Sequence, residues 1–231
     1  MPTSAVPAAL SYADADARLG GALSAVFEGA GASPGYDEVL FFDGDLTLDG
    51  DFLDAINELR RGDDEHDVEL IVVTGDLTVR GPIALYEDRP GLYVGGRTEA
   101  ETLEGGDAEI CIHDGVFTHL VYGWYNHGSL QTGIVDTPWV IDYDHHMEVG
   151  ARGARWVNNY EDDDDADFAV GDGIIEAFVP EVVDAEDGSL RVEDFLDRLR
   201  AGLPVLRPGA RSETESASDH GPGPHASLPK P

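Results

Sequence analysis

Three histidines and an aspartate are the residues of this sequence whose types and spacing best suit chemistry: His127, Asp144, His145 and His146. His145 and His146 follow His127 at nearly the interval at which glycines recur in this part of the chain. In a β-structure whose coils have that length, such residues lie on neighbouring strands about 4.7–4.9 Å apart. Imidazole and carboxylate groups together suit a divalent transition metal such as zinc, iron or manganese. A metal site at these four residues, with Asp107 one coil earlier, is therefore one hypothesis for this cluster.

A purely structural role is the alternative for the same residues, and it is the one that the sequence favours. Adjacent side chains on a strand point to opposite faces, so regular geometry lets only one of His145 and His146 stack with His127. The pair would then lie in a turn and bond to the backbone. If a metal is held, Asp144 is the expected base for activating water. Phosphate-loop, dinucleotide and nucleophile-elbow motifs are absent from the sequence, so we expect no other cofactor.

The element that would position these residues is a repeat that runs from Leu70 to Met147. Glycines recur there at nearly even intervals, each after a short run of strand-favouring residues, and we expect them at the corners of the coils. The string Gly-Asp-Leu-Thr occurs both at 44–47 and at 75–78. This period predicts a mainly β, single-domain parallel β-helix (solenoid) with coils of about 20 residues, each burying its inward side chains on the next. The recurring glycines are Gly75, Gly95, Gly115 and Gly133.

Segments on both sides of the repeat predict short flanking helices that would cap the solenoid. Apolar residues at steps of three and four indicate these helices, and a glycine is a natural stop for the last one. The predicted parts are a flexible N-terminus at 1–12, a solenoid domain with flanking helices at 13–206, and a disordered tail at 207–231. Helices are expected at 13–27, 51–61 and 192–201, a loop at 62–67, an irregular segment at 149–173 and an apolar, partly β-like segment at 174–183.

Charge is the strongest signal in the composition. The chain has 47 acidic and 14 basic residues, a net charge of −33. Such a surface repels phosphate, which argues against nucleic acid and against anionic membranes as partners. Solubility in a high-salt cell is the favoured explanation, because the acids are spread along the chain. The alternative is an acidic face for a basic protein partner.

Location and redox chemistry follow from what the sequence lacks. It has no run of 18 apolar residues and no basic start followed by an apolar stretch, so we expect a soluble cytoplasmic protein without a membrane span. The single cysteine, Cys111, lies in a strand-like run between two isoleucines. It cannot form an intramolecular disulfide, and a buried, inert thiol is expected.

Aromatic residues gather in the second half of the repeat. Their surroundings alternate with turn residues, and such rings pack in cores and cross-strand ladders more often than they form a ligand platform. We therefore expect a packing role for Tyr122, Trp124, Tyr125 and Trp139.

The repeated Gly-Asp-Leu-Thr words resemble those of bacterial β-helical proteins described as polymer-forming or bactofilin-like. More narrowly, the segments Tyr125–Leu130 (YNHGSL) and Asp144–Met147 (DHHM), with a closing Leu199–Leu206, are similar to an uncharacterised bacterial group of that kind. The resemblance covers roughly residues 37–206 and implies a β-helix fold. Bactofilins are implied to polymerise by stacking bare coil ends. Helices flank the array here, and such flanks act as caps, so we do not expect filaments.

The sequence is therefore compatible with three functions. The first is a non-enzymatic scaffold or protein-interaction protein with an acidic surface, which contacts a protein partner or associates with itself. The second is a metal-dependent enzyme that uses His127 and the Asp144–His146 cluster. The third is an acidic inhibitor or immunity-type protein that masks a basic partner, with binding steered by the negative field. A non-enzymatic role is favoured.

Overall fold

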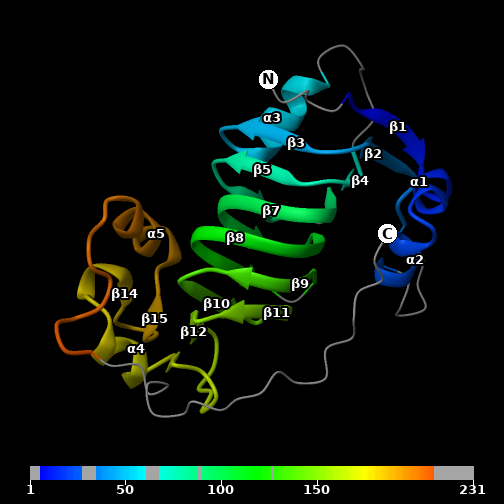
Figure 1. Ribbon diagram of the computed structural model, residues 1–231. Helices are drawn as coiled ribbons and strands as arrows, with labels where there is room; N and C mark the ends of the chain where they lie inside the picture. Colours follow the sequence, from blue (N-terminus) through cyan, green and yellow to red (C-terminus); the bar gives the residue numbers. More distant parts are fainter. Residues whose placement is uncertain (1–5, 28–34, 61–67, 88–89, 126, 211–231) are drawn as a thin grey trace.

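The computed structural model describes residues 6–27, 35–60, 68–87, 90–125 and 127–210. Most of its strands wind as a parallel β-solenoid (Figure 1). The predicted loop at 62–67 lies outside the described residues. None of the described helices has both the length and the apolar character that crossing a bilayer would require. The strands are β1 (Ala8–Ser11), β2 (Glu38–Phe42), β3 (Leu46–Asp49), β4 (Leu70–Val73), β5 (Leu77–Arg80), β6 (Ile83–Leu85), β7 (Gly91–Gly105), β8 (Glu109–Trp124), β9 (Ser129–Asp136), β10 (Trp139–Tyr143), β11 (His146–Arg152), β12 (Arg155–Asn158), β13 (Phe168–Ala169), β14 (Val183–Asp184) and β15 (Ser189–Leu190). The helices are α1 (Tyr12–Arg18), α2 (Ala22–Phe27), α3 (Phe52–Leu59), α4 (Asp172–Ala177), the short 3₁₀ helix η1 (Pro180–Val182) and α5 (Val192–Arg200).

Three faces of parallel strands form the walls of the solenoid, and the long strands run from one face to the next. The first face consists of β2, β4 and the first parts of β7, β8, β9 and β11. The second face consists of β3, β5 and the next parts of the same long strands. The third face consists of β6, the last parts of β7 and β8, and then β10, β12 and β13.

The register between neighbouring coils confirms the predicted solenoid. One line of inward-facing positions runs along the first face, and its members lie on successive coils. One coil has about 19 residues, close to the shortest repeats that solenoid proteins use. This line consists of Ile71, Leu92, Ile110, Leu130 and Met147.

Inward side chains of all three faces fill the solenoid with one continuous apolar core. Phe42 and Phe117 are among its largest fully buried members. The helix α3 closes the end of this core, because its buried face carries Phe52 and Ile56. Its N-terminus is capped by Asp51, whose carboxylate accepts a hydrogen bond from the backbone N–H of Asp54 at 3.1 Å. Figure 1 places α3 over the end of the stack beside β3.

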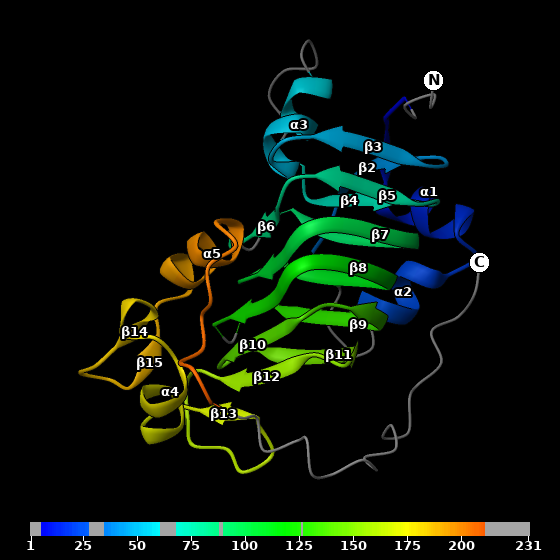
Figure 2. The same ribbon diagram turned by 60° about the vertical axis from the view of Figure 1, so that its left-hand side comes forward.

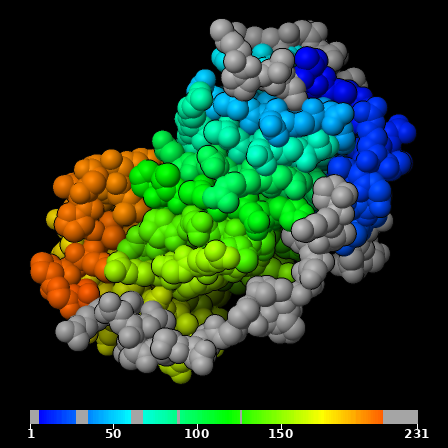
Figure 3. All heavy atoms as spheres, in the orientation of Figure 1, coloured from blue at the N-terminus to red at the C-terminus, as the bar shows by residue number. Residues whose placement is uncertain are grey.

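Elements from the two ends of the chain cover the outer surfaces of two faces. Leu23 and Phe27 of α2 are buried against the outer side of the first face. On the third face, α4, α5 and the β14–β15 hairpin pack on outward side chains such as Trp139, whose ring lies 5.3 Å from that of Phe195. Figures 2 and 3 show the two groups on different sides of the coil stack. The helices α2, α4 and α5 therefore lie along the sides of the solenoid, whereas α3 covers one of its ends.

The repeated Gly-Asp pairs form the corner between the first and second faces. Asp45 Oδ1 accepts a hydrogen bond from the backbone N–H of Asp76 at 2.9 Å, and Asp76 Oδ1 accepts one from the N–H of Arg97 at 2.8 Å. The corner glycines leave room for these bonds. A Cβ on Gly96 would lie 2.5 Å from Asp76 Oδ1, and one on Gly75 would lie 2.8 Å from the backbone N of Asp45. The Gly-Asp pair recurs at 44–45 and 75–76 because each of these aspartates bonds its coil to the next one.

One of the recurring glycines has a different role. The period predicts Gly115 as a corner, but it pairs with Thr98 inside the second face. The ring of Phe117 packs over it, so a Cβ there would lie 2.9 Å from that ring. The glycine spacing therefore predicts the coil length correctly, but the prediction of a corner at Gly115 is wrong.

Both ends of the described chain are more ordered than the sequence predicts. The prediction of a flexible N-terminus at 1–12 is wrong for residues 8–11, because β1 pairs antiparallel with β2. The prediction of disorder from 207 onward is wrong for 207–210, because Arg207 donates hydrogen bonds to the carbonyls of Ala177 and Phe178. Residues 211–231 lie outside the described residues.

Three internal segments also differ from expectation. The segment 149–173 is not irregular throughout, because β11 continues the first two faces and β12 continues the third. Residues 174–183, expected to be partly β-like, begin inside α4, whose apolar side is buried on the C-terminal core, and reach a strand only at Val183. The helix expected at 13–27 is interrupted, because two glycines with positive φ separate α1 from α2.

The corner geometry predicts that Gly96→Ala destabilises the protein. The added methyl group would collide with Asp76 Oδ1 and with the backbone of Gly75, and overpacking of this kind costs about 1–3 kcal/mol. Urea unfolding measures the loss. The matched control is Gly173→Ala, because a Cβ there meets no atom within 4 Å. Equal stability of the two variants would contradict the proposed corner.

Candidate functional site

The structure separates His127 from the other three residues that the sequence suggests as metal ligands. Asp144, His145 and His146 line one cavity of about 300 Å³, and His127 is not part of that lining. His146 pairs in register with Ser129 and not with His127, so these two histidines do not stack. The His127 ring packs edge-on against a neighbouring tyrosine ring, at 4.9 Å between centroids. In the part of the chain that the structure describes, no three His, Cys, Asp or Glu side chains are grouped to hold a metal ion.

His145 instead has a role in packing and hydrogen bonding. Its backbone N–H donates to Asp142 Oδ1 at 3.0 Å, and its ring Nδ1 is bonded to the carbonyl oxygen of Tyr125. The ring occupies space that a glycine leaves, since a Cβ on Gly123 would lie 2.7 Å from His145 Cδ2. Burial lowers the pKa of His145, although the Tyr125 carbonyl and the Asp142 carboxylate oppose that shift. Its Nε2 is buried and has no hydrogen-bond partner. The same is true of Oδ1 of Asp107.

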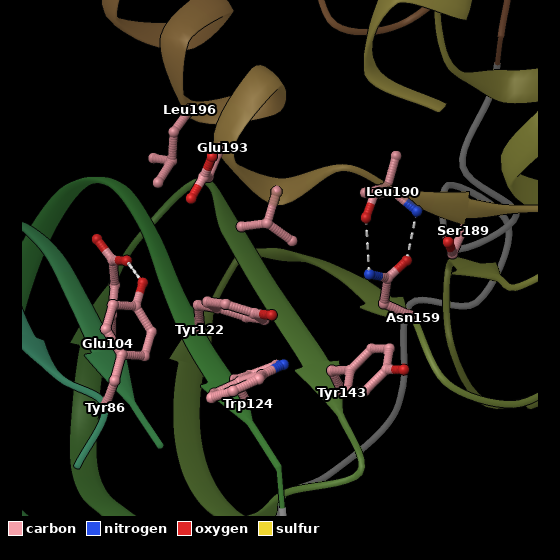
Figure 4. Close-up of a pocket in the computed structure, with 11 residues that line it drawn as sticks. Tyr86, Glu104, Tyr122, Trp124, Tyr143, Asn159, Ser189, Leu190, Glu193 and Leu196 are labelled. Carbon is pink, nitrogen blue, oxygen red and sulfur yellow. Dashed lines mark hydrogen bonds between the residues drawn. The ribbon is translucent and has the colours of Figure 1, made fainter. Parts of the chain in front are cut away.

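A larger cavity lies elsewhere, between the outer side of the third face and the C-terminal elements. It has a volume of about 510 Å³, within the range of ligand sites. Rings on the strands form its floor, and residues of α5 and β15 form its wall (Figure 4). We name it the acid–aromatic cleft. Its lining residues are Tyr86, Glu104, Tyr122, Trp124, Tyr143, Asn159, Ser189, Leu190, Val192, Glu193 and Leu196.

The carboxylate of Glu104 is the most unusual group of the cleft, because the residue is only 5% exposed. Its Oε1 accepts a hydrogen bond from the Thr102 hydroxyl at 2.5 Å, and its Oε2 accepts one from the Tyr86 hydroxyl. Burial and the nearby Glu104 charge raise the pKa of Tyr86, so this phenol stays protonated and donates. Two hydroxyl groups therefore stabilise the carboxylate, and none of the described lining residues is a lysine, arginine or histidine.

Two of the rings are open to solvent. Tyr86 and Trp124 are each 40% exposed, and they meet edge to face with 6.0 Å between ring centroids. Tyr122 is buried beside them, and burial followed by the charge of Glu104 raises its pKa. The expected packing role is thus confirmed for Tyr122 and for Trp139, which belong to the buried C-terminal core. For Trp124 and Tyr125 it holds only in part, because their rings pack together with 5.8 Å between centroids but are 40% and 43% exposed, and the ring of Trp124 lines the cavity.

The wall of the cleft is held in place by Asn159. This side chain is 3% exposed and bonds both backbone groups of Leu190: Nδ2 donates to the carbonyl oxygen at 3.0 Å, and Oδ1 accepts from the N–H at 2.6 Å. Figure 4 shows the paired bonds at one end of the cleft. Asn159 therefore joins β15, and through it the start of α5, to the solenoid.

Sequence reasoning missed most of the cleft. The coil register contains the signal, because Glu104 pairs with Tyr122, and Trp124 pairs with Tyr143 one coil later. Outward positions of one face thus collect an acid and three rings. The contribution of Glu193 has no such signal, because α5 comes from outside the coil repeat.

Cys111 has the environment that the sequence predicts. It is 2% exposed and packs in the apolar layer between the first face and the N-terminal helices. Burial raises the pKa of its thiol to about 12, so it remains protonated and unreactive at neutral pH.

Comparisons of the chain with models of protein families, with curated proteins and with solved structures find no match. The resemblance to bactofilin-like proteins therefore stays a prediction, and the site has to be interpreted from its own geometry.

The burial of His145 predicts how stability depends on pH. Its pKa in the folded chain lies below the ordinary value of 6.5, so near and below that pH the unfolded chain binds more protons. Stability should fall as the pH drops from 7 through 6.5, and less steeply in His145→Asn. Unfolding in urea at several pH values measures both slopes. Asp142, whose pKa burial raises, contributes with the opposite sign in both proteins.

The exposed neighbour provides the control for this experiment. His146 has a side chain that is 66% exposed and lies 3.8 Å from Glu148. His146→Asn removes only the nearby charge that adds to the lowered pKa of His145, so it should change the slope less than His145→Asn does. An unchanged slope in His145→Asn would contradict the argument from burial.

The clamp at Asn159 predicts a second stability change. Asn159→Leu would leave the N–H and C=O of Leu190 buried without partners, and each unsatisfied group costs about 1–3 kcal/mol. Urea unfolding and protease cleavage near β15 measure the loss. Ser189→Ala, on the same strand, is the control and should change stability by less than about 0.5 kcal/mol. A loss no larger than that of the control would show that Asn159 does not hold the wall.

Proposed function

We propose that this chain is a non-enzymatic, cytoplasmic β-solenoid protein that binds a basic protein partner. The acid–aromatic cleft is its contact site. The observation that carries the proposal is the buried carboxylate of Glu104, which faces a solvent-accessible cavity with a second acid, Glu193, on the opposite wall. Two carboxylates without a basic residue among the described lining residues favour a ligand that brings positive charge.

The charge of the whole chain supports the same conclusion. A net charge of −33 attracts a basic protein from a distance and raises its association rate, most strongly at low salt. The same charge opposes the approach of a second copy, so a different protein is the favoured partner over self-association. Masking of a basic protein, as an inhibitor or immunity-type protein does, is one form that this function would take.

Affinity capture tests the proposal. We expect the immobilised full-length chain to retain a basic protein from an extract of its own cells at about 50 mM salt and to release it at about 500 mM, because screening shortens the range of the attraction. The retained protein is then purified and its Kd is measured by calorimetry. The Kd should rise with salt, and it should rise further when Glu104→Gln and Glu193→Gln are combined.

The control for this measurement removes the same charge elsewhere. Asp136→Asn with Glu176→Gln changes two exposed acids outside the cleft. Equal weakening by both pairs would mean that general charge, and not the cleft, holds the partner. Failure to retain any basic protein, or turnover of a substrate by the purified chain, would contradict the proposed function itself.

A further inference from the structure

We propose that the acid–aromatic cleft receives the guanidinium group of an arginine side chain. This inference rests on the proposed function and names the chemical group through which a basic partner would be recognised. Three features of the cleft carry it: the placement of acids around it, the exposed ring surface and the apolar wall.

The acids favour a cation with several donors. Glu104 comes from the floor of the cleft and Glu193 comes from α5 above it, so a ligand between them meets carboxylates from two sides (Figure 4). The Glu193 charge is close enough to contribute to the raised pKa of Tyr86. Both oxygens of Glu104 already accept a hydroxyl hydrogen bond, and each carboxylate oxygen can accept another. Guanidinium carries five N–H donors in one plane and can serve two acids at once.

The rings favour a flat cation over a compact one. Tyr86 and Trp124 expose ring surface at the cleft, and Tyr143 lies on the strand next to Trp124. A guanidinium group stacks on such faces and loses less hydration than an ammonium group, which keeps its water shell. The same chain contains one arginine over an indole ring, since the Arg155 guanidinium carbon lies 5.3 Å from the centroid of Trp139.

The wall of the cleft fits the rest of an arginine side chain. Leu190, Val192 and Leu196 line it with apolar surface, and the methylene stem of arginine packs on surfaces of this kind while its head reaches polar groups. The volume of about 510 Å³ exceeds one side chain, so the flanking backbone of a peptide also fits. A neutral sugar would use the rings but would leave the two carboxylates without a counter-charge.

Small capped amino acids test the inference without any protein partner. The probes are N-acetyl-arginine amide, the lysine analogue and the citrulline analogue, whose neutral ureido group has nearly the shape of guanidinium. Binding is followed through the indole N–H resonance of Trp124 in NMR spectra, with Trp139 and Trp156 as internal references outside the cleft lining. We expect a saturable shift of Trp124 with arginine, binding of lysine several-fold weaker, and binding of citrulline at least about tenfold weaker.

Variants then locate the bound group. Glu193→Gln, on the exposed helix surface, should weaken arginine binding several-fold without affecting the fold, and Glu104→Gln should weaken it further. The pair Asp136→Asn and Glu176→Gln should bind arginine like the native chain. Thermal unfolding of each variant confirms that the cleft is intact. Because Glu193 lies on the helix surface and outside the buried core, its variant keeps the test valid if Glu104→Gln unfolds.

Three results would overturn the inference. They are the absence of a saturable Trp124 shift with arginine, equal affinity for citrulline, and a shift caused by the neutral sugar maltotriose but not by arginine. The outcomes also separate the two proposals. A basic partner that binds through the cleft while the arginine probe does not would overturn only this inference. Binding of the probe with no basic partner retained would overturn the proposed function and leave the arginine site.

Discussion

Each coil of this chain can bury its inward side chains only on the coils above and below it, and the other elements depend on that constraint. The register line through Leu92, Ile110 and Leu130 keeps the apolar interior continuous. The corner bonds made by Asp45 and Asp76 fix the same register through the backbone. Because neighbouring coils cannot slide without breaking both, outward side chains on successive coils also acquire fixed neighbours.

Those fixed outward neighbours create the candidate site. On the first face they are apolar from β2 to β8 and are buried by the N-terminal helices, so that part of the face is structural. On the third face only some of the outward side chains are apolar. The carboxylate of Glu104 and the ring of Trp124 lie beside them. The C-terminal elements cover the apolar part and are anchored by Asn159, which leaves the acid–aromatic cleft between the two. Packing and binding therefore use the same face.

The sequence predicts the fold better than the site, for physical reasons. Glycine periodicity reports where the backbone of one coil touches the next, so the coil length and the parallel array follow from it. It does not show which residue of one coil lies opposite which residue of the next. His146 would have to lie opposite His127 for the two rings to stack, but it lies opposite Ser129, two positions further along the chain. The cleft also needs Glu193, whose place depends on how a distant helix docks. Docking of that kind leaves no local pattern.

Oxidative cross-linking of engineered cysteine pairs tests the coil register most directly. Glu99 and Val116 pair across adjacent coils on the open second face, and strands in register lie about 4.8 Å apart, which a disulfide can span. Thr78 and Val116 are separated by an intervening coil, about 9–10 Å, which is too far. The account predicts a disulfide in the Glu99→Cys, Val116→Cys protein and none in the Thr78→Cys, Val116→Cys protein, with buried Cys111 left in place. Cross-linking of the second pair in preference to the first would contradict it.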